Sequence, residues 1–248
     1  MRMYLYFFGV FMVLFATGVI LARADQVVPE EIIAQTDKAR GNLQGIVWIA
    51  DIESQEDGKI QHRSLIIKNR GENSVAEFTA PAKVQGNKLV MLDRNMWFTK
   101  PGLSKPVPIS PRQKLIGGAA NGDIASTNYA ADYDAVLVSE DQVEGIPCYV
   151  FDLSAKSKKT TYDRIRYWVS KERLLAEKAE FFTLSGKLFK TATFRYDNTF
   201  GNDKGGQQPF ISRMTIFDEV TKGNVTIMNY HDIKLETLPD AVFNLNLL

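Results

Sequence analysis

The chain contains few of the residues from which catalytic and metal sites are built. It has one cysteine, Cys148, and two histidines, His62 and His231. A zinc site needs three or four converging ligands at recognised spacings, and none of those spacings is present. Neither histidine has a serine or cysteine partner at a recognised spacing, and a single cysteine excludes an internal disulfide. We therefore expect no bound metal, no cofactor and no enzymatic activity.

Phosphate-binding motifs and a surplus of positive charge are also absent. The sequence has neither the G-x-x-x-x-G-K-[ST] nor the G-x-G-x-x-G arrangement of glycines that nucleotide-binding loops use. Its 30 lysines and arginines nearly balance its 29 aspartates and glutamates. Nucleic-acid-binding domains usually carry a clear basic excess, so we expect no nucleic-acid partner.

The N-terminus holds the longest apolar run. Arg2 precedes apolar residues from Met3 to Leu21, and Ala22-Arg23-Ala24 follows. A basic start, an apolar stretch and small residues in an A-x-A site are the pattern of a signal peptide. We therefore predict a signal peptide at 1–24, cleavage after Ala24, and a single exported domain at 25–248. The alternative is an uncleaved anchor, because a run of about 19 apolar residues is long enough to span a bilayer.

Helical signals are sparse in the predicted mature domain. Pro29–Arg40 is the clearest helix, because Pro29 suits a first turn and Glu30 and Glu31 favour the positive N-terminal end. Gly41 is suited to end the helix. The predicted buried stripe of this helix is Ile32, Ile33, Thr36 and Ala39.

From Gly45 onward the pattern is that of β-strands. In Gly45–Ser54 the apolar residues Ile46, Trp48 and Ile52 share one face. Asp57-Gly58 is a strong hairpin signal, and turn signals recur about every 8–12 residues. Because no alternation of strands with helices is seen, we predict a mainly β domain, a sandwich or barrel of ten or eleven antiparallel strands.

Aromatic residues are plentiful in the predicted strands: the chain has 15 Phe, nine Tyr and three Trp. Several strands are apolar on both faces, whereas the strands of a simple sandwich alternate more cleanly. This pattern fits either an ordinary large core covered by helices or a barrel with an apolar cavity large enough for an acyl chain. The side chains expected to line such an interior are Trp48, Phe78, Met91, Trp97, Phe151, Trp168, Phe181, Phe194 and Met228.

The order of several weak motifs resembles that of the outer-membrane lipoprotein-sorting protein family, in an uncharacterised LolA-like branch of the LolA/LolB-like superfamily. The matching positions are Trp97, Pro101, Tyr129, Tyr133, Trp168, Leu174, Gly186 and Lys190. Ser170 departs from the pattern, because the family commonly has Asp there. The resemblance implies a half-open antiparallel β-barrel of about eleven strands, with the N-terminal helix and short helices plugging its mouth.

Met91–Gly118 is a basic segment that contains Pro101, Pro106, Pro108 and Pro111, four of the chain's nine prolines. We predict one short helix within Ser110–Gly118 and another near Asp123–Asn128. Under the resemblance this region would be a lid, with apolar residues over the barrel mouth and basic residues toward lipid headgroups or an anionic membrane surface. The alternative is a solvated loop with no role in binding. The expected lid residues are Leu103, Lys105, Arg112, Lys114, Leu115 and Ile116.

The resemblance implies a monomeric periplasmic carrier that holds the acyl chains of lipids or lipid-modified proteins. An inner-membrane exporter is a further expected partner, and peripheral membrane contact is expected. One alternative is a non-enzymatic interaction subunit of a membrane lipid-export complex. A hydrolase would be favoured only if His62 or His231 lay in a cleft beside a carboxylate.

Overall fold

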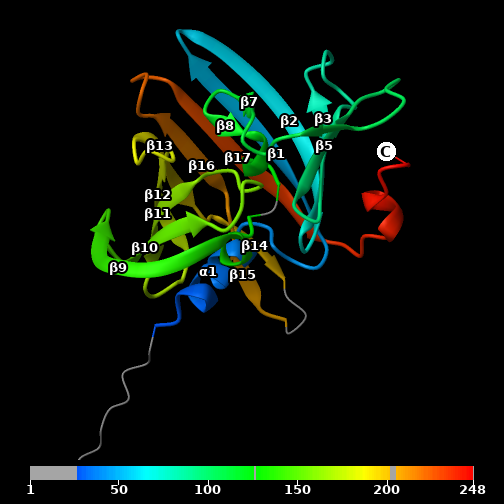
Figure 1. Ribbon diagram of the computed structural model, residues 1–248. Coiled ribbons are helices and arrows are strands. Elements are labelled where there is room, and N and C mark those ends of the chain that lie inside the picture. The colour runs from blue at the N-terminus through cyan, green and yellow to red at the C-terminus, as the bar shows by residue number, and fades with distance from the viewer. Residues whose placement is uncertain (1–26, 126, 202–204, 248) are drawn as a thin grey trace, which may run out of the picture.

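The structure is a computed structural model that describes residues 27–125, 127–201 and 205–247 (Figure 1). The predicted signal peptide lies outside these residues. Helix α1 spans Pro29–Lys38, with Pro29 at its start, as the sequence predicts. Of its predicted stripe, Ile33, Thr36 and Ala39 are buried. Within the described residues, no helix combines the length and apolarity needed to cross a membrane.

One antiparallel sheet of thirteen strands dominates the fold. In spatial order its strands are β6 (Val107–Ile109), β5 (Asn95–Thr99), β4 (Lys88–Leu92), β3 (Asn73–Ala80), β2 (Lys59–Arg70), β1 (Ile46–Glu56), β17 (Val225–Leu235), β16 (Arg213–Asp218), β13 (Leu188–Arg195), β12 (Ala176–Phe182), β11 (Arg164–Ser170), β10 (Ile146–Ala155) and β9 (Tyr133–Val143). The sheet curves around a core and is not closed, since its edge strands β6 and β9 do not pair (Figure 1). The prediction of a half-open antiparallel barrel is confirmed.

The remaining described elements are short. They comprise β7 (Lys114–Ile116) paired with β8 (Ala119–Ala120), β14 (Asn198–Gly201) paired with β15 (Gln207–Phe210), the one-turn helix α2 (Tyr129–Asp132), and the 3-10 turns η1 (Asn121–Asp123) and η2 (Asp240–Phe243). The helix α1, the hairpin β7–β8 and α2 all contribute side chains to the core on the concave side of the sheet. In Figure 1 the hairpin β7–β8 lies over that side.

Strand β1 follows the predicted alternation closely. Ile46, Trp48 and Ile52 are buried on its inner face. Asp57 and Gly58 form the tight turn to β2, both with positive φ (49° and 75°), as the Asp-Gly signal predicts. Here a local pattern was sufficient, because alternation and turn chemistry both depend on neighbouring residues.

Neither of the two short helices predicted after Pro108 forms where the sequence analysis placed it. Ser110–Gly118 forms no helix and instead contains β7, which pairs with β8. The helix predicted near Asp123–Asn128 is replaced by η1 before it and α2 after it. The Ser110 hydroxyl does accept a hydrogen bond from the Arg112 amide at 3.2 Å, but this closes a turn that no helix continues.

The C-terminal segment packs on the outer face of the sheet. Leu238 and Phe243 form a small cluster with Val75 and Val90 of β3 and β4. Arg70 fixes the segment by donating to the Leu238 carbonyl at 2.9 Å, and its guanidinium lies 4.8 Å from the centre of the Phe243 ring.

Candidate functional site

The concave face of the main sheet is apolar along most of its width. Six of the nine residues predicted to line an interior belong to the one large core cluster on this face: Trp48, Phe78, Phe151, Phe181, Phe194 and Met228. They come from strands on both halves of the sheet, so the interior is one continuous apolar region. Contact of these side chains with a ligand stays a prediction.

Trp97 and Trp168 lie on the opposite face, contrary to the prediction. Trp97 is paired with Val90, whose side chain packs in the outer cluster beneath the C-terminal segment. Trp97 also lines an open groove of about 410 Å³ that Lys158 and Lys159 border on the other side. Trp168 is buried against Cys148 and Val150 in a separate outer cluster. The strand positions were right, but a shift of one residue in the assumed alternation moves a side chain to the other face.

A cover segment, Pro111–Asp123, lies across the interior. Its side chains Ile116, Ala119 and Ala120 are buried, and Leu115 packs against the core cluster. Leu115 and Ile116, two of the predicted lid residues, therefore face the apolar interior. Leu103 and Lys105 belong to the preceding turn between β5 and β6, where Lys105 is exposed, and they are not part of the cover segment.

The turn of the cover segment rests directly on β1 and β17. The Gly118 amide donates to the Thr226 hydroxyl at 2.8 Å. A Cβ at Gly117 would lie 2.0 Å from the Ser54 hydroxyl oxygen and 2.2 Å from that of Thr226, and Gly117 also has a positive φ of 55°. Only glycine allows this close approach in this conformation.

Two of the three basic residues predicted on the lid, Arg112 and Lys114, are paired with acids of the barrel. Arg112 Nη1 lies 2.6 Å from Asp163, and its Nε donates to the Thr160 carbonyl at 2.9 Å. Lys114 Nζ lies 2.7 Å from Glu56 at the end of β1. Both side chains therefore hold the cover segment in place. Their predicted contact with lipid headgroups stays a prediction.

Side chains of the described residues fill most of the interior beneath the cover segment. One cavity of about 30 Å³ lies at the open side of the sheet and is lined by Arg40, Met91, Tyr129 and Asp132, among others. Another, of about 10 Å³, lies between Arg40, Trp48 and Tyr230. The first has room for about two water molecules and the second for at most about one. A larger ligand fits beneath the cover segment only if the side chains of this segment move out of the core.

Two charged residues at the end of α1 lie inside this core. Asp37 is fully buried, and its Oδ2 accepts a hydrogen bond from the Ala130 amide of α2 at 2.9 Å. Burial raises the pKa of this carboxyl to about 7. Arg40 is 6% exposed, donates to the Tyr167 hydroxyl at 3.2 Å, and places its guanidinium 4.7 Å from the centre of the Phe194 ring.

Sequence reasoning missed both residues. It treated Arg40 only as the last residue of the predicted helix, outside the buried stripe. A stronger signal was available, because Ile33, Asp37 and Arg40 recur at spacings of four and three residues and so lie on the buried stripe. Charged residues on an apolar stripe mark buried polar contacts.

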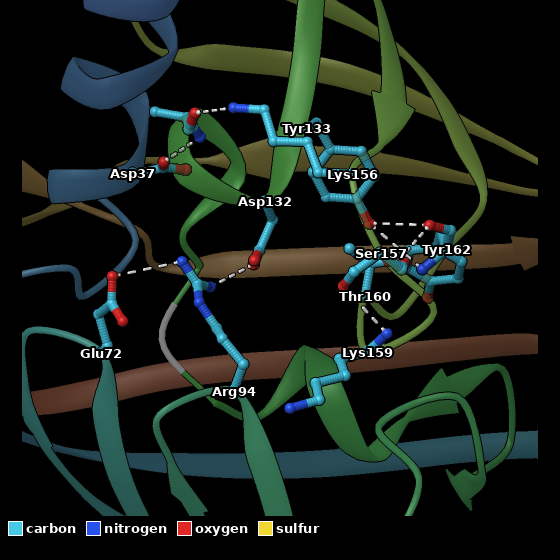
Figure 2. A network of polar contacts seen from close by, with 11 residues as sticks. Asp37, Glu72, Arg94, Asp132, Tyr133, Lys156, Ser157, Lys159, Thr160 and Tyr162 are labelled. Carbon is cyan, nitrogen blue, oxygen red and sulfur yellow. Dashed lines mark hydrogen bonds and ion pairs between the residues drawn. The ribbon is translucent and has the colours of Figure 1, made fainter.

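The open side of the sheet is bridged by a polar network, which Figure 2 shows. Arg94, in the turn between β4 and β5, lies 2.5 Å from Asp132 of α2 and 3.4 Å from Glu72. Nearby, the Tyr133 hydroxyl donates to the Tyr162 carbonyl at 3.1 Å and accepts from the Tyr162 amide at 3.2 Å. The Arg94–Asp132 contact joins the two halves of the sheet where strand pairing does not, whereas the Tyr133–Tyr162 hydrogen bonds lie within one half.

Neither histidine lies in a cleft. His62 is exposed, 3.6 Å from Glu53. His231 lies 2.9 Å from Asp51, which raises the pKa of the imidazole, but the Ser64 hydroxyl donates to Asp51 and not to the imidazole. Within the part of the chain that the structure describes, no hydroxyl is hydrogen-bonded to this ring, so the serine–histidine contact of a hydrolase is not formed there. Groups of three or more metal-ligating side chains are also absent from the described residues.

Solved structures share the fold along nearly the whole chain. A LolA superfamily protein of Nitrosomonas europaea is 29% identical, with 90% of this chain and 100% of that chain covered and a TM-score of 0.81. A DUF1329 family protein of Desulfovibrio piger is 24% identical, with 87% and 95% covered and a TM-score of 0.72. An outer membrane lipoprotein-sorting protein domain of Vibrio parahaemolyticus is 20% identical, with 88% and 97% covered and a TM-score of 0.73.

Two comparisons of sequence bear on the family of the chain. No curated protein matches the chain. A family model described as an uncharacterised protein matches residues 70–248, from the end of β2 to the C-terminus. The chain therefore belongs to this uncharacterised family, and its half-open barrel places it in the LolA-like superfamily.

Proposed function

We propose that the protein is a non-enzymatic carrier that binds the acyl chains of lipids or lipid-modified proteins on the concave face of its sheet. The proposal rests on the fold shared with the LolA superfamily protein and on the apolar inner face. Export to the periplasm is part of the proposal, supported by the apolar run and the A-x-A site that ends at Ala24.

The observation that carries the proposal is the independence of the cover segment from the main sheet. Its strands β7 and β8 pair with each other, in a separate two-stranded sheet. The segment also closes on itself, since the Asn121 amide donates to the Gln113 carbonyl at 2.8 Å and the Gly122 amide donates to the Pro111 carbonyl at 2.9 Å. The cover segment can therefore leave the core without breaking any strand pair of the barrel.

Acyl chains are suited to take the place of the cover segment. Its displacement removes Leu115, Ile116 and Ala119 from the core cluster, and the vacated surface is apolar. Leaving that surface in water costs about 25 cal/mol per Å². A bound hydrocarbon chain offsets this cost because it covers the same inner face.

A disulfide that locks the cover segment tests the proposal. A Cβ at Gly118 lies 3.6 Å from the Thr226 hydroxyl oxygen, so Gly118→Cys with Thr226→Cys brings the two sulfurs within reach of each other. We expect the oxidised double variant to bind a fluorescent fatty acid at least about tenfold more weakly than the wild type. Reduction should restore binding.

The two single cysteine variants are the matched controls, and both should bind under oxidising conditions. Native mass spectrometry of the protein as purified provides a second readout, because a carrier should retain lipid. Equal binding by the locked and reduced forms would contradict displacement of the cover segment. Absence of any lipid binding would favour an interaction subunit of a lipid-export complex.

A further inference from the structure

Three neighbouring β-hairpins expose a large aliphatic side chain at their tips. Ile60, at the β1–β2 turn, and Val220, at the β16–β17 turn, are each 60% exposed. Leu184, at the β12–β13 turn, is 88% exposed. Single exposed aliphatic residues are common on protein surfaces, but here one projects from each of three turns. We call Ile60, Leu184 and Val220 the hairpin rim.

Hydrogen bonds place the three turns side by side at one end of the sheet. The Asp57 amide donates to the Asn224 side chain at 3.0 Å, which joins the first turn to the β16–β17 turn. The Glu219 amide donates to the Phe189 carbonyl at 3.0 Å, which joins that turn to the start of β13. In Figure 1 the three tips follow one another at the upper left of the molecule.

A lysine accompanies each exposed aliphatic side chain. Lys59 precedes Ile60, Lys187 follows Leu184 by three residues, and Lys222 follows Val220 by two. Among the described residues Lys59 and Lys187 have no acidic partner, whereas Lys222 is paired with Glu219. Apolar side chains next to long basic ones are typical of surfaces that sit at the boundary between lipid headgroups and acyl chains.

The hairpin rim lies at the end of the sheet to which the cover segment is tied. Lys114 of the cover segment is paired with Glu56, which directly precedes the first turn. Gly118 is bonded to Thr226, the second residue of β17. A cover segment that opens at this end would expose the interior next to the three tips.

We propose that the hairpin rim docks the protein on an anionic phospholipid bilayer, with Ile60, Leu184 and Val220 entering the interfacial layer and the lysines contacting lipid phosphates. A bilayer fits separate protruding side chains because it deforms around each one, whereas a protein partner usually covers one contiguous patch. This inference rests on the proposed carrier function, since it assigns where such a carrier meets its donor or acceptor membrane.

Vesicle flotation tests the assignment. The exported protein is purified, and its intact mass identifies its first residue. It is then mixed with vesicles of phosphatidylcholine containing phosphatidylglycerol. We expect the variant with Ile60→Ser, Leu184→Ser and Val220→Ser to partition at least about tenfold more weakly than the wild type. Lys59→Glu with Lys187→Glu should weaken partitioning by less, and this effect should shrink at high salt.

Leu247→Ser is the matched control. Leu247 is 68% exposed but belongs to the C-terminal segment, away from the three tips (Figure 1). Its replacement should leave partitioning unchanged. Failure of the wild type to bind vesicles, or equal partitioning by the triple variant, would overturn the inference, as would a self-associated wild type that the triple variant converts to monomer.

Fatty-acid binding without vesicles separates this inference from the carrier function. The triple variant should bind the fluorescent fatty acid as the wild type does, because the hairpin rim contributes nothing to the concave face. If the wild type binds no fatty acid, the carrier function itself is contradicted. Loss of vesicle binding alone, with fatty-acid binding intact, contradicts only the docking surface.

Discussion

The Arg94 guanidinium lies 2.5 Å from the Asp132 carboxylate across the open side of the half-barrel. Arg94 comes from the β4–β5 turn in one half of the sheet, and Asp132 comes from α2 just before β9, the edge strand of the other half. The edge strands β6 and β9 are not hydrogen-bonded to each other, so this ion pair links the two halves of the sheet in place of strand pairing. Both side chains are less than one quarter exposed, which limits screening by solvent.

Removal of this ion pair should loosen the barrel. We expect Arg94→Ala to lower the free energy of unfolding by about 1–3 kcal/mol, because Asp132 is left partly buried without its cation. Urea unfolding provides the measurement. The control is Arg195→Ala, which breaks an exposed pair with Glu144 and should cost no more than about 1 kcal/mol. Equal losses of unfolding free energy in the two variants would mean that the Arg94–Asp132 contact contributes no more than an exposed surface pair.

The buried carboxyl of Asp37 should make stability depend on pH. Burial raises its pKa from 3.8 to about 7, so the folded state favours the protonated form. The stability gained by binding this proton in the folded state is fully present below pH 3.8, the pKa of the unfolded state. It is lost as the pH rises to about 7, the pKa in the folded state. Between about pH 4 and pH 7 the wild type should therefore lose up to about 4 kcal/mol relative to Asp37→Asn.

Denaturation midpoints of the wild type and Asp37→Asn, measured from acid to mildly alkaline pH, test this dependence. The Asn side chain keeps an acceptor for the Ala130 amide, so the variant should fold and its advantage should grow as the pH rises. Parallel pH profiles for the two proteins would show that Asp37 does not titrate in this range.

The length of a bound acyl chain should control affinity. If the concave face takes the chain, each added methylene should strengthen binding by about 0.8 kcal/mol until the face is full. Competition between a fluorescent fatty acid and saturated fatty acids of increasing length measures this slope. Affinity that does not change with chain length would contradict burial of the chain in the apolar interior.

Cleavage after Ala24 should leave Asp25 as the first residue of the exported protein. Intact mass of the protein recovered from the periplasm is the measurement. Ala22→Leu with Ala24→Leu should block processing, because bulky residues replace the small ones at the cleavage site. A wild-type chain that keeps Met1 and stays in the inner membrane would show that the segment is an anchor.

Features set by neighbouring residues were predictable from the sequence. The helix beginning at Pro29 depends on proline and on acidic residues in its first turn. The inner face of β1 depends on alternation around Trp48, and the β1–β2 hairpin depends on Asp57-Gly58. The β-rich class follows from the repetition of such local signals, and the order of weak motifs indicated the LolA-like fold.

Only the tertiary structure determined which faces meet. Trp97 and Trp168 point outward because strand register, set by partners distant in sequence, decides the face of each residue. The segment around Ile116 became a hairpin because docking on Ser54 and Thr226 outweighs its weak helical signals. The Arg94–Asp132 contact depends on the curvature of the sheet, which brings the β4–β5 turn close to α2. A contact across unpaired edges leaves no local pattern in the sequence.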